Sequence, residues 1–100
     1  MTEIRLLVED MSKEVEMAKH YYELALFYKD FNMEFARKYV EIAKQEINHS
    51  NMLHEMAVTC IKKAEEKGKE ATDYMKQKWN EAHVEFVDEM KELEYKLSRI

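Results

Sequence analysis

The stretch that decides the fold is residues 39–53, which read YVEIAKQEINHSNML. It contains neither proline nor glycine, and apolar residues continue on both sides of it at helical spacing. The resulting apolar stripe consists of Phe35, Ala36, Tyr39, Ile42, Ala43, Leu53, Met56, Ala57, Cys60 and Ala64. Glu46 and His49 stand within this stripe, where two more apolar residues would be expected. A carboxylate on a buried helix face is unfavourable unless another group pairs with it, so the stretch indicates a long helix that carries a polar site.

The spacing of Glu46 and His49 suits metal binding. Residues three apart lie on one face of a helix about one turn from each other, so both side chains can reach one ion. None of the other three histidines follows a glutamate at this spacing. The alternative is a hydrogen-bonded pair that ties two helices together without a metal.

Composition predicts a single all-α domain over residues 1–100. The chain has no proline, one glycine and 46% hydrophobic residues, which favours helix throughout. Breaks around residues 29–32 and Gly68 divide it into three long helices that short connections make antiparallel. The expected helices run from Thr2 or Glu3 to about Lys29, from about Met33 to about Lys67, and from residues 71–73 to about Arg99. Asn32 and Thr72 are the expected N-caps of the second and third; a separate first turn over residues 1–10 is the alternative.

Charge and apolar patterning restrict the partners. The net charge is −5 and the basic residues are spread along the chain, which argues against nucleic acid. No apolar run approaches the ~18 residues of a membrane span. The first residues lack a signal-peptide pattern and Cys60 is the only cysteine, so we expect a cytoplasmic protein. Large residues off the main stripes suggest a second buried face, and hence at least a homodimer; they are Tyr21, Leu24, Tyr28, Ile47, Val58 and Ile61.

Hairpin geometry points to a carboxylate on the first helix. If the first turn is centred on Phe31, Glu16 and Glu46 each lie 15 residues from it and therefore at the same height. One Glu and one Glu-x-x-His are half of the ligand set of di-iron carboxylate bundles. A two-fold dimer would supply the other half and form the site at its interface. Four carboxylates and two imidazoles suit iron or manganese.

The pattern of Glu16 followed by Glu46-x-x-His49 resembles the ferritin-like superfamily, and most of all its short half-bundle members, the encapsulated ferritins. The run of residues 46–55, EINHSNMLHE, is similar to their second helix, and the resemblance covers about residues 11–65. It implies a di-iron site between two subunits, ferroxidase-like oxidation of iron(II), and iron handling or oxidant detoxification. Tyr22 falls where those proteins carry an aromatic near the iron, which implies a role in electron transfer or hydrogen bonding. Glu23 departs from the family pattern, because an aromatic residue is expected there.

Further residues are weaker candidates. Mirrored about Gly68, His83 comes level with Leu53, so it is a metal ligand, a partner that orients a ligand, or an ordinary core histidine. Glu89 reaches the same region, whereas His20 and Glu23 follow Glu16 as ligands, ion-entry residues or solvated side chains. We expect His54 to point away from Glu46, at the surface or in an interface.

Two other functions fit the sequence. One is a small acidic helical interaction protein, in which Glu16, Glu46 and His49 form a polar network that fixes helix register and no metal binds. The other, ranked below it, is a structural zinc site, which carboxylate-rich ligands suit less well than sets of cysteine and histidine.

Overall fold

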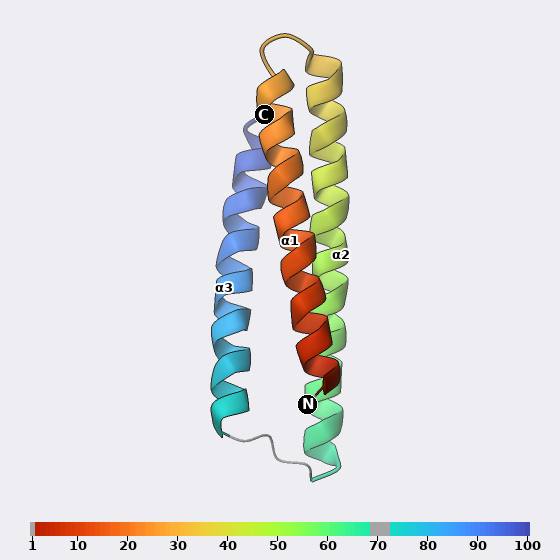
Figure 1. Ribbon diagram of the computed structural model, residues 1–100, viewed down its shortest axis with the longest axis vertical. Helices are drawn as coiled ribbons and strands as arrows, with labels where there is room; N and C mark the ends of the chain where they lie inside the picture. The colour runs from red at the N-terminus through yellow and green to blue at the C-terminus, as the bar shows by residue number, and fades with distance from the viewer. Residues whose placement is uncertain (1, 69–72) are drawn as a thin grey trace.

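The computed structural model describes residues 2–68 and 73–100 and consists of three helices. They are α1 (Thr2–Tyr28), α2 (Met33–Glu66) and α3 (Asp73–Ser98). The described residues contain no strand, so the prediction of an all-helical chain is confirmed. Because α1 is continuous from Thr2, the alternative of a separate first turn is wrong. The three rods lie side by side in an elongated molecule of 56 × 17 × 17 Å (Figure 1).

The break between α1 and α2 lies where the sequence predicts it. The amide N–H of Asn32 donates to the carbonyl of Tyr28 at 2.8 Å and closes the turn. The side-chain oxygen of Asn32 then accepts from the amide of Phe35 at 3.1 Å, as expected of an N-cap. The chain therefore reverses over a few residues, and α2 runs back along α1 (Figure 1).

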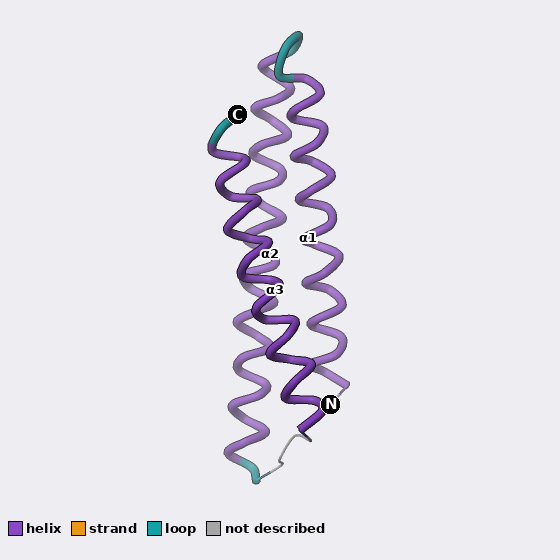
Figure 2. The backbone as a smooth tube through the Cα atoms, turned by 90° about the vertical axis from the view of Figure 1, so that its left-hand side faces the viewer, coloured by secondary structure: helices purple, strands orange, loops and turns teal. Residues whose placement is uncertain are grey.

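Gly68 ends α2 in the left-handed region, with φ +70°. Its amide donates to the carbonyl of Glu65 at 3.0 Å, so it acts as the expected C′ glycine. The expected cap Thr72 lies outside the described residues. Beyond that segment, α3 lies along the other two helices in both views (Figures 1 and 2). No described helix is both long enough and apolar enough to cross a bilayer.

The core lies where the three helices meet. Its buried residues are Met11, Val15 and Ala18 of α1, Ala43 and Ile47 of α2, and Phe86, Met90, Leu93 and Leu97 of α3. Ala18 and Ala43 are fully buried, and their small side chains let α1 and α2 approach closely. The hydrophobic effect of this core holds α3 against the α1–α2 pair.

The buried face of α2 differs from the predicted stripe. It consists of Ala36, Ala43, Ile47, Ser50 and Ala57, whereas Phe35 and Met56, which the prediction buries, are about half exposed. Ile47, assigned by the sequence to a second face, belongs to the core of the single chain. The helix is thus rotated from the expected orientation because its small residues face α1 and α3. As a result Glu46 and His49 lie at the edge of the packed face instead of its centre.

Candidate metal centre

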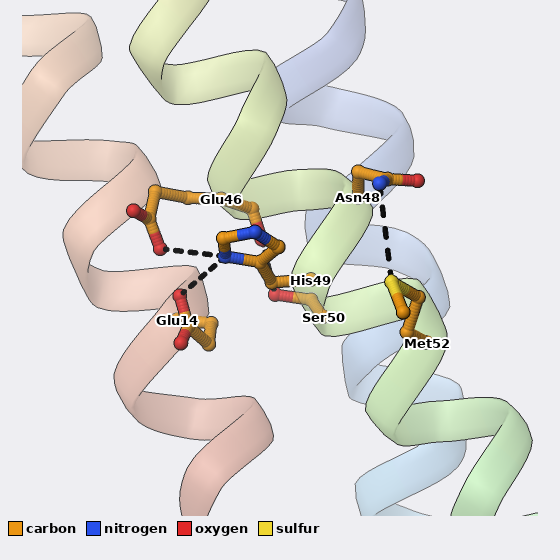
Figure 3. A network of polar contacts seen from close by, with 6 residues as sticks. All are labelled: Glu14, Glu46, Asn48, His49, Ser50 and Met52. Carbon is orange, nitrogen blue, oxygen red and sulfur yellow. Dashed lines mark hydrogen bonds and ion pairs between the residues drawn. The ribbon is translucent and has the colours of Figure 1, made fainter.

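Three potential metal ligands from two helices meet on one side of the molecule: Glu14 of α1, and Glu46 and His49 of α2. One ligand atom from each lies within 4.8 Å of the other two. Nδ1 of His49 is 3.8 Å from Oε2 of Glu14 and 3.7 Å from Oε2 of Glu46. Figure 3 shows one ring nitrogen of His49 facing both carboxylates, with α3 behind the α1–α2 pair. The group therefore opens on the face that α3 does not cover.

Helix packing sets this convergence. Glu46 and His49 are separated by one turn of α2, and the buried Ala43 and Ile47 beside them fix that helix against α1. On α1, Glu14 directly precedes the buried Val15 and so borders the packed face. Both carboxylates are therefore held on helices that the core fixes against each other.

The two carboxylates of the group are more buried than the imidazole. The side chains of Glu14 and Glu46 keep 26% and 14% of their accessible surface, whereas that of His49 keeps 54%. Oε2 of Glu14 is fully buried and accepts no hydrogen bond. Nδ1 of His49 is 3.8 Å from this oxygen, which is too long for a hydrogen bond. The buried oxygen therefore lacks the cation or hydrogen-bond donor that buried polar atoms normally have.

A metal ion would meet that demand. Two atoms that bind one ion at about 2.1 Å lie roughly 3.0–4.2 Å apart, depending on the angle between the bonds. Both distances from Nδ1 of His49 fall in this range. Two carboxylate oxygens and one imidazole form a donor set suited to iron(II), manganese(II) or zinc(II). Three protein ligands leave further coordination positions open on the exposed side.

Of the predicted ligands, the structure brings together Glu46 and His49 but not Glu16. Glu16 is exposed and lines a groove between α1 and α3 with Glu85 and Phe86. Glu14, two residues before Glu16, lies beside Glu46 and His49 instead. Two residues correspond to a rotation of about 200° around the helix, so the side chains of Glu14 and Glu16 point in nearly opposite directions. Glu14 and Glu46 are both 16 residues from Asp30, so they lie at the same height if the turn is centred on Asp30 instead of Phe31.

His83 and Tyr22 also lie away from the group. Nδ1 of His83 is 2.7 Å from Nε2 of His54, so His83 pairs with the histidine that the sequence assigned to the surface or to an interface. Burial, followed by the charge of His83, lowers the pKa of the half-buried His54. Tyr22 packs against the core near α3, with Nζ of Lys96 5.9 Å from its ring centre.

The other candidates have different neighbours. Glu89 forms an ion pair with Lys19, with 3.4 Å between Oε2 and Nζ. His20 is exposed, and its ring centre is 5.6 Å from that of Tyr21. Glu23 is exposed and lines a groove with Lys19 and Glu89. None of these three belongs to the convergent group.

The sequence did contain a signal for Glu14. It lies three residues after Met11 and four before Ala18, which are both members of the buried stripe of α1. A glutamate at this spacing projects from the same side of the helix as they do.

Comparison with known proteins adds no identification. No protein-family model, no curated protein and no solved structure matches the chain.

Proposed function

We propose that the protein binds iron(II) or manganese(II) through Glu14, Glu46 and His49, and that a second copy of the chain completes a two-ion site. The observation that carries this proposal is the meeting of three ligand atoms from two helices around a buried carboxylate oxygen that lacks a hydrogen bond. A network that only fixed helix register would be expected to satisfy that oxygen.

The ligand set supports a paired arrangement. A glutamate from one helix and Glu-x-x-His from the next are half of the set found in di-iron carboxylate bundles. The group opens away from α3, so that a second copy could approach it. Met17 and Met52, one helical turn after Glu14 and His49, are about half exposed and provide apolar surface beside it. Two copies related by a two-fold axis would supply four carboxylates and two imidazoles.

In this site the carboxylates neutralise the ions, and the imidazole completes the coordination of each. The Glu46-x-x-His49 motif resembles that of ferritin-like proteins. By that resemblance, the dimer would take up iron(II) as substrate and oxidise it to iron(III). The electron would pass to dioxygen or peroxide. Ferroxidase activity is therefore the enzymatic form of the proposal, and metal binding is its minimal form.

The test is the iron content after anaerobic loading with iron(II) and desalting, compared between wild type and Glu46→Ala. We expect about one iron per chain in the wild type, that is, two per dimer, and a loss in the variant. Glu41→Ala, which removes an exposed carboxylate of the same helix, is the matched control and should keep its iron. Light scattering on the loaded protein should give the mass of a dimer. Equal iron content in all three proteins, or none in any, would contradict the proposal.

A second function, docking to a protein partner, is favoured by one separate observation. Aromatic side chains are exposed around the α1–α2 turn: Phe27 and Phe31 each keep 64% of their surface and Phe35 keeps 49%. Large exposed apolar patches mark interaction surfaces. If no metal binds, this aromatic patch supports the alternative of a helical interaction protein. Pull-down of partners by wild type but not by Phe27→Ser/Phe31→Ser would establish it.

A further inference from the structure

A pair of histidines joins α2 to α3. Nε2 of His54 and Nδ1 of His83 lie 2.7 Å apart, although the residues are 29 positions apart in the chain. Both side chains are half-buried. Within residues 2–68 and 73–100, neither ring forms an ion pair with a carboxylate. One ring nitrogen from each helix thus faces the other, and either nitrogen of a neutral imidazole can offer a lone pair once the hydrogen lies on the other one.

Neighbouring aromatic rings hold the pair in place. The ring centres of the two histidines are 4.8 Å apart, with 25° between their planes. Phe86 stacks on His54 at 5.1 Å and 10°. Trp79 lies 5.8 Å from the ring of His54 and 6.0 Å from that of His83. Packing against Phe86 and Trp79 restricts the rings, so the two nitrogens are positioned before any ligand binds.

We infer that His54 and His83 form a metal site of their own, distinct from the carboxylate group, for a divalent ion that prefers imidazole, such as zinc(II) or copper(II). Imidazole nitrogen suits both ions, whereas iron(II) and manganese(II) fit better to the carboxylates. Water would fill the remaining positions, since the pair supplies two ligands.

The geometry needs only a small adjustment. Two nitrogens that bind one tetrahedral ion lie about 3.3 Å apart, because each bond is about 2.0–2.1 Å long. The rings must therefore separate by roughly 0.6 Å from their contact at 2.7 Å. In the metal-free pair, one of the facing nitrogens carries the hydrogen of the bond. That ring must move its proton to its other nitrogen, so both facing lone pairs become free and the neutral pair releases no net proton.

The consequence is a link between α3 and the α1–α2 pair that depends on the metal. Because the two ligands come from different helices, the site exists only when α3 is docked. An ion that binds the folded chain alone raises its apparent stability. In a His49→Gln background, which weakens the carboxylate group, zinc(II) should therefore raise the melting temperature, and the rise should be smaller when His83→Gln is added.

The first test uses Trp79, which is the only tryptophan of the chain. Copper(II) is titrated into a His49→Gln background, which weakens competition from the carboxylate group, and tryptophan fluorescence is recorded. We expect saturable quenching at about one ion per chain. His54→Gln or His83→Gln, added to this background, should abolish the saturable phase, and His20→Gln should retain it. Equal quenching in all four proteins would overturn the inference.

A second measurement uses the wild type and does not depend on whether a variant folds. Zinc(II) is added while the ring nitrogens are followed by long-range proton–nitrogen NMR. Nε2 of His54 and Nδ1 of His83 should shift together, and the nitrogens of His20 should stay in place. If neither facing nitrogen shifts at excess zinc(II), the site does not exist. Iron loading at Glu46 tests the proposed function separately, so either idea can fail without the other.

Discussion

Replacement of Glu14 by Gln should stabilise the metal-free protein. The two carboxylates of the candidate centre have oxygens within 4.8 Å of each other, and one oxygen of Glu14 is buried without a hydrogen bond. These like charges repel each other across the centre. The amide of glutamine removes one negative charge and adds a donor that can reach Glu46.

The size of the effect follows from Coulomb's law. Two unit charges at 4.8 Å repel by about 0.9 kcal/mol in water and by about 3.5 kcal/mol at an effective dielectric constant of about 20. The side chains of Glu14 and Glu46 keep 26% and 14% of their accessible surface, so the repulsion lies between these limits, and we expect a gain of about 1–3 kcal/mol in the free energy of unfolding. For a chain of this length, each 1 kcal/mol of that gain corresponds to a rise of about 4–8 °C in melting temperature.

The assay is urea and thermal unfolding in a chelating buffer, repeated with saturating manganese(II). Without metal, Glu14→Gln should be more stable than the wild type; with metal, the order should reverse, because the ion stabilises only a protein that binds it. Glu16→Gln, an exposed carboxylate of the same helix, is the control and should change stability by less than about 0.5 kcal/mol. A metal-free Glu14→Gln protein less stable than the wild type would show that the carboxylate serves a stabilising network.

Three further predictions concern the fold. Ile47→Ala should lower the free energy of unfolding by about 2–5 kcal/mol, because it opens a cavity in the core, as urea titration would show. Asn32→Ala should cost about 1 kcal/mol, since the amide of Phe35 loses its cap; urea unfolding measures this too. Lys96→Gln should raise the pKa of Glu92, now held below its ordinary value of 4.5 by the hydrogen bond and charge of Lys96; a carboxyl carbon NMR titration measures it.

The pH dependence of the last variant has a defined sign. A carboxylate whose pKa is lowered by folding stabilises the folded state above the pKa of the unfolded chain, and this contribution is lost as the pH falls through the folded value. Any stability difference between Lys96→Gln and the wild type should thus shrink on acidification below about pH 4. An unchanged pKa of Glu92 would refute the pairing.

Controls exist for the other two variants. Val84→Ala removes an exposed apolar side chain and should have little effect beside Ile47→Ala. Asn48→Ala alters an exposed asparagine inside α2 and should not reproduce the loss caused by Asn32→Ala. If Val84→Ala lowers the free energy of unfolding as much as Ile47→Ala, loss of burial is not the cause. If Asn48→Ala lowers it as much as Asn32→Ala, loss of the cap is not the cause.

Much of the fold could be predicted because local signals agree. Absence of proline, the cap at Asn32 and the glycine at position 68 define the helices, and the structure bears out the first break and the end of α2 within one residue. Which face of α2 is buried could not be predicted with the same success. Its stripe contains large and small apolar residues, and close helix packing selects the small ones, Ala36, Ala43 and Ala57, while Phe35 stays half exposed.

The candidate site was predictable in part for the same reason. The spacing of Glu46 and His49 is a property of one helix, so the sequence is enough to place them together. The partner carboxylate depends on how α1 is rotated and where the turn is centred. Shifting the centre of the turn by one residue shifts the residue opposite Glu46 by two, from Glu14 to Glu16. A shift of two residues places the side chain on nearly the opposite side of the helix. The contact of His54 with His83 depends on α3 in the same way.

The most direct test of the central claim is anomalous X-ray diffraction from crystals of the wild type soaked in manganese(II). Binding by Glu14, Glu46 and His49 predicts an anomalous peak within bonding distance of all three side chains, and no such peak in crystals of Glu46→Ala soaked in the same way. If the soaked wild type shows no peak there, or the three side chains point apart, the group is not a metal site and the aromatic patch at the α1–α2 turn becomes the better guide to function.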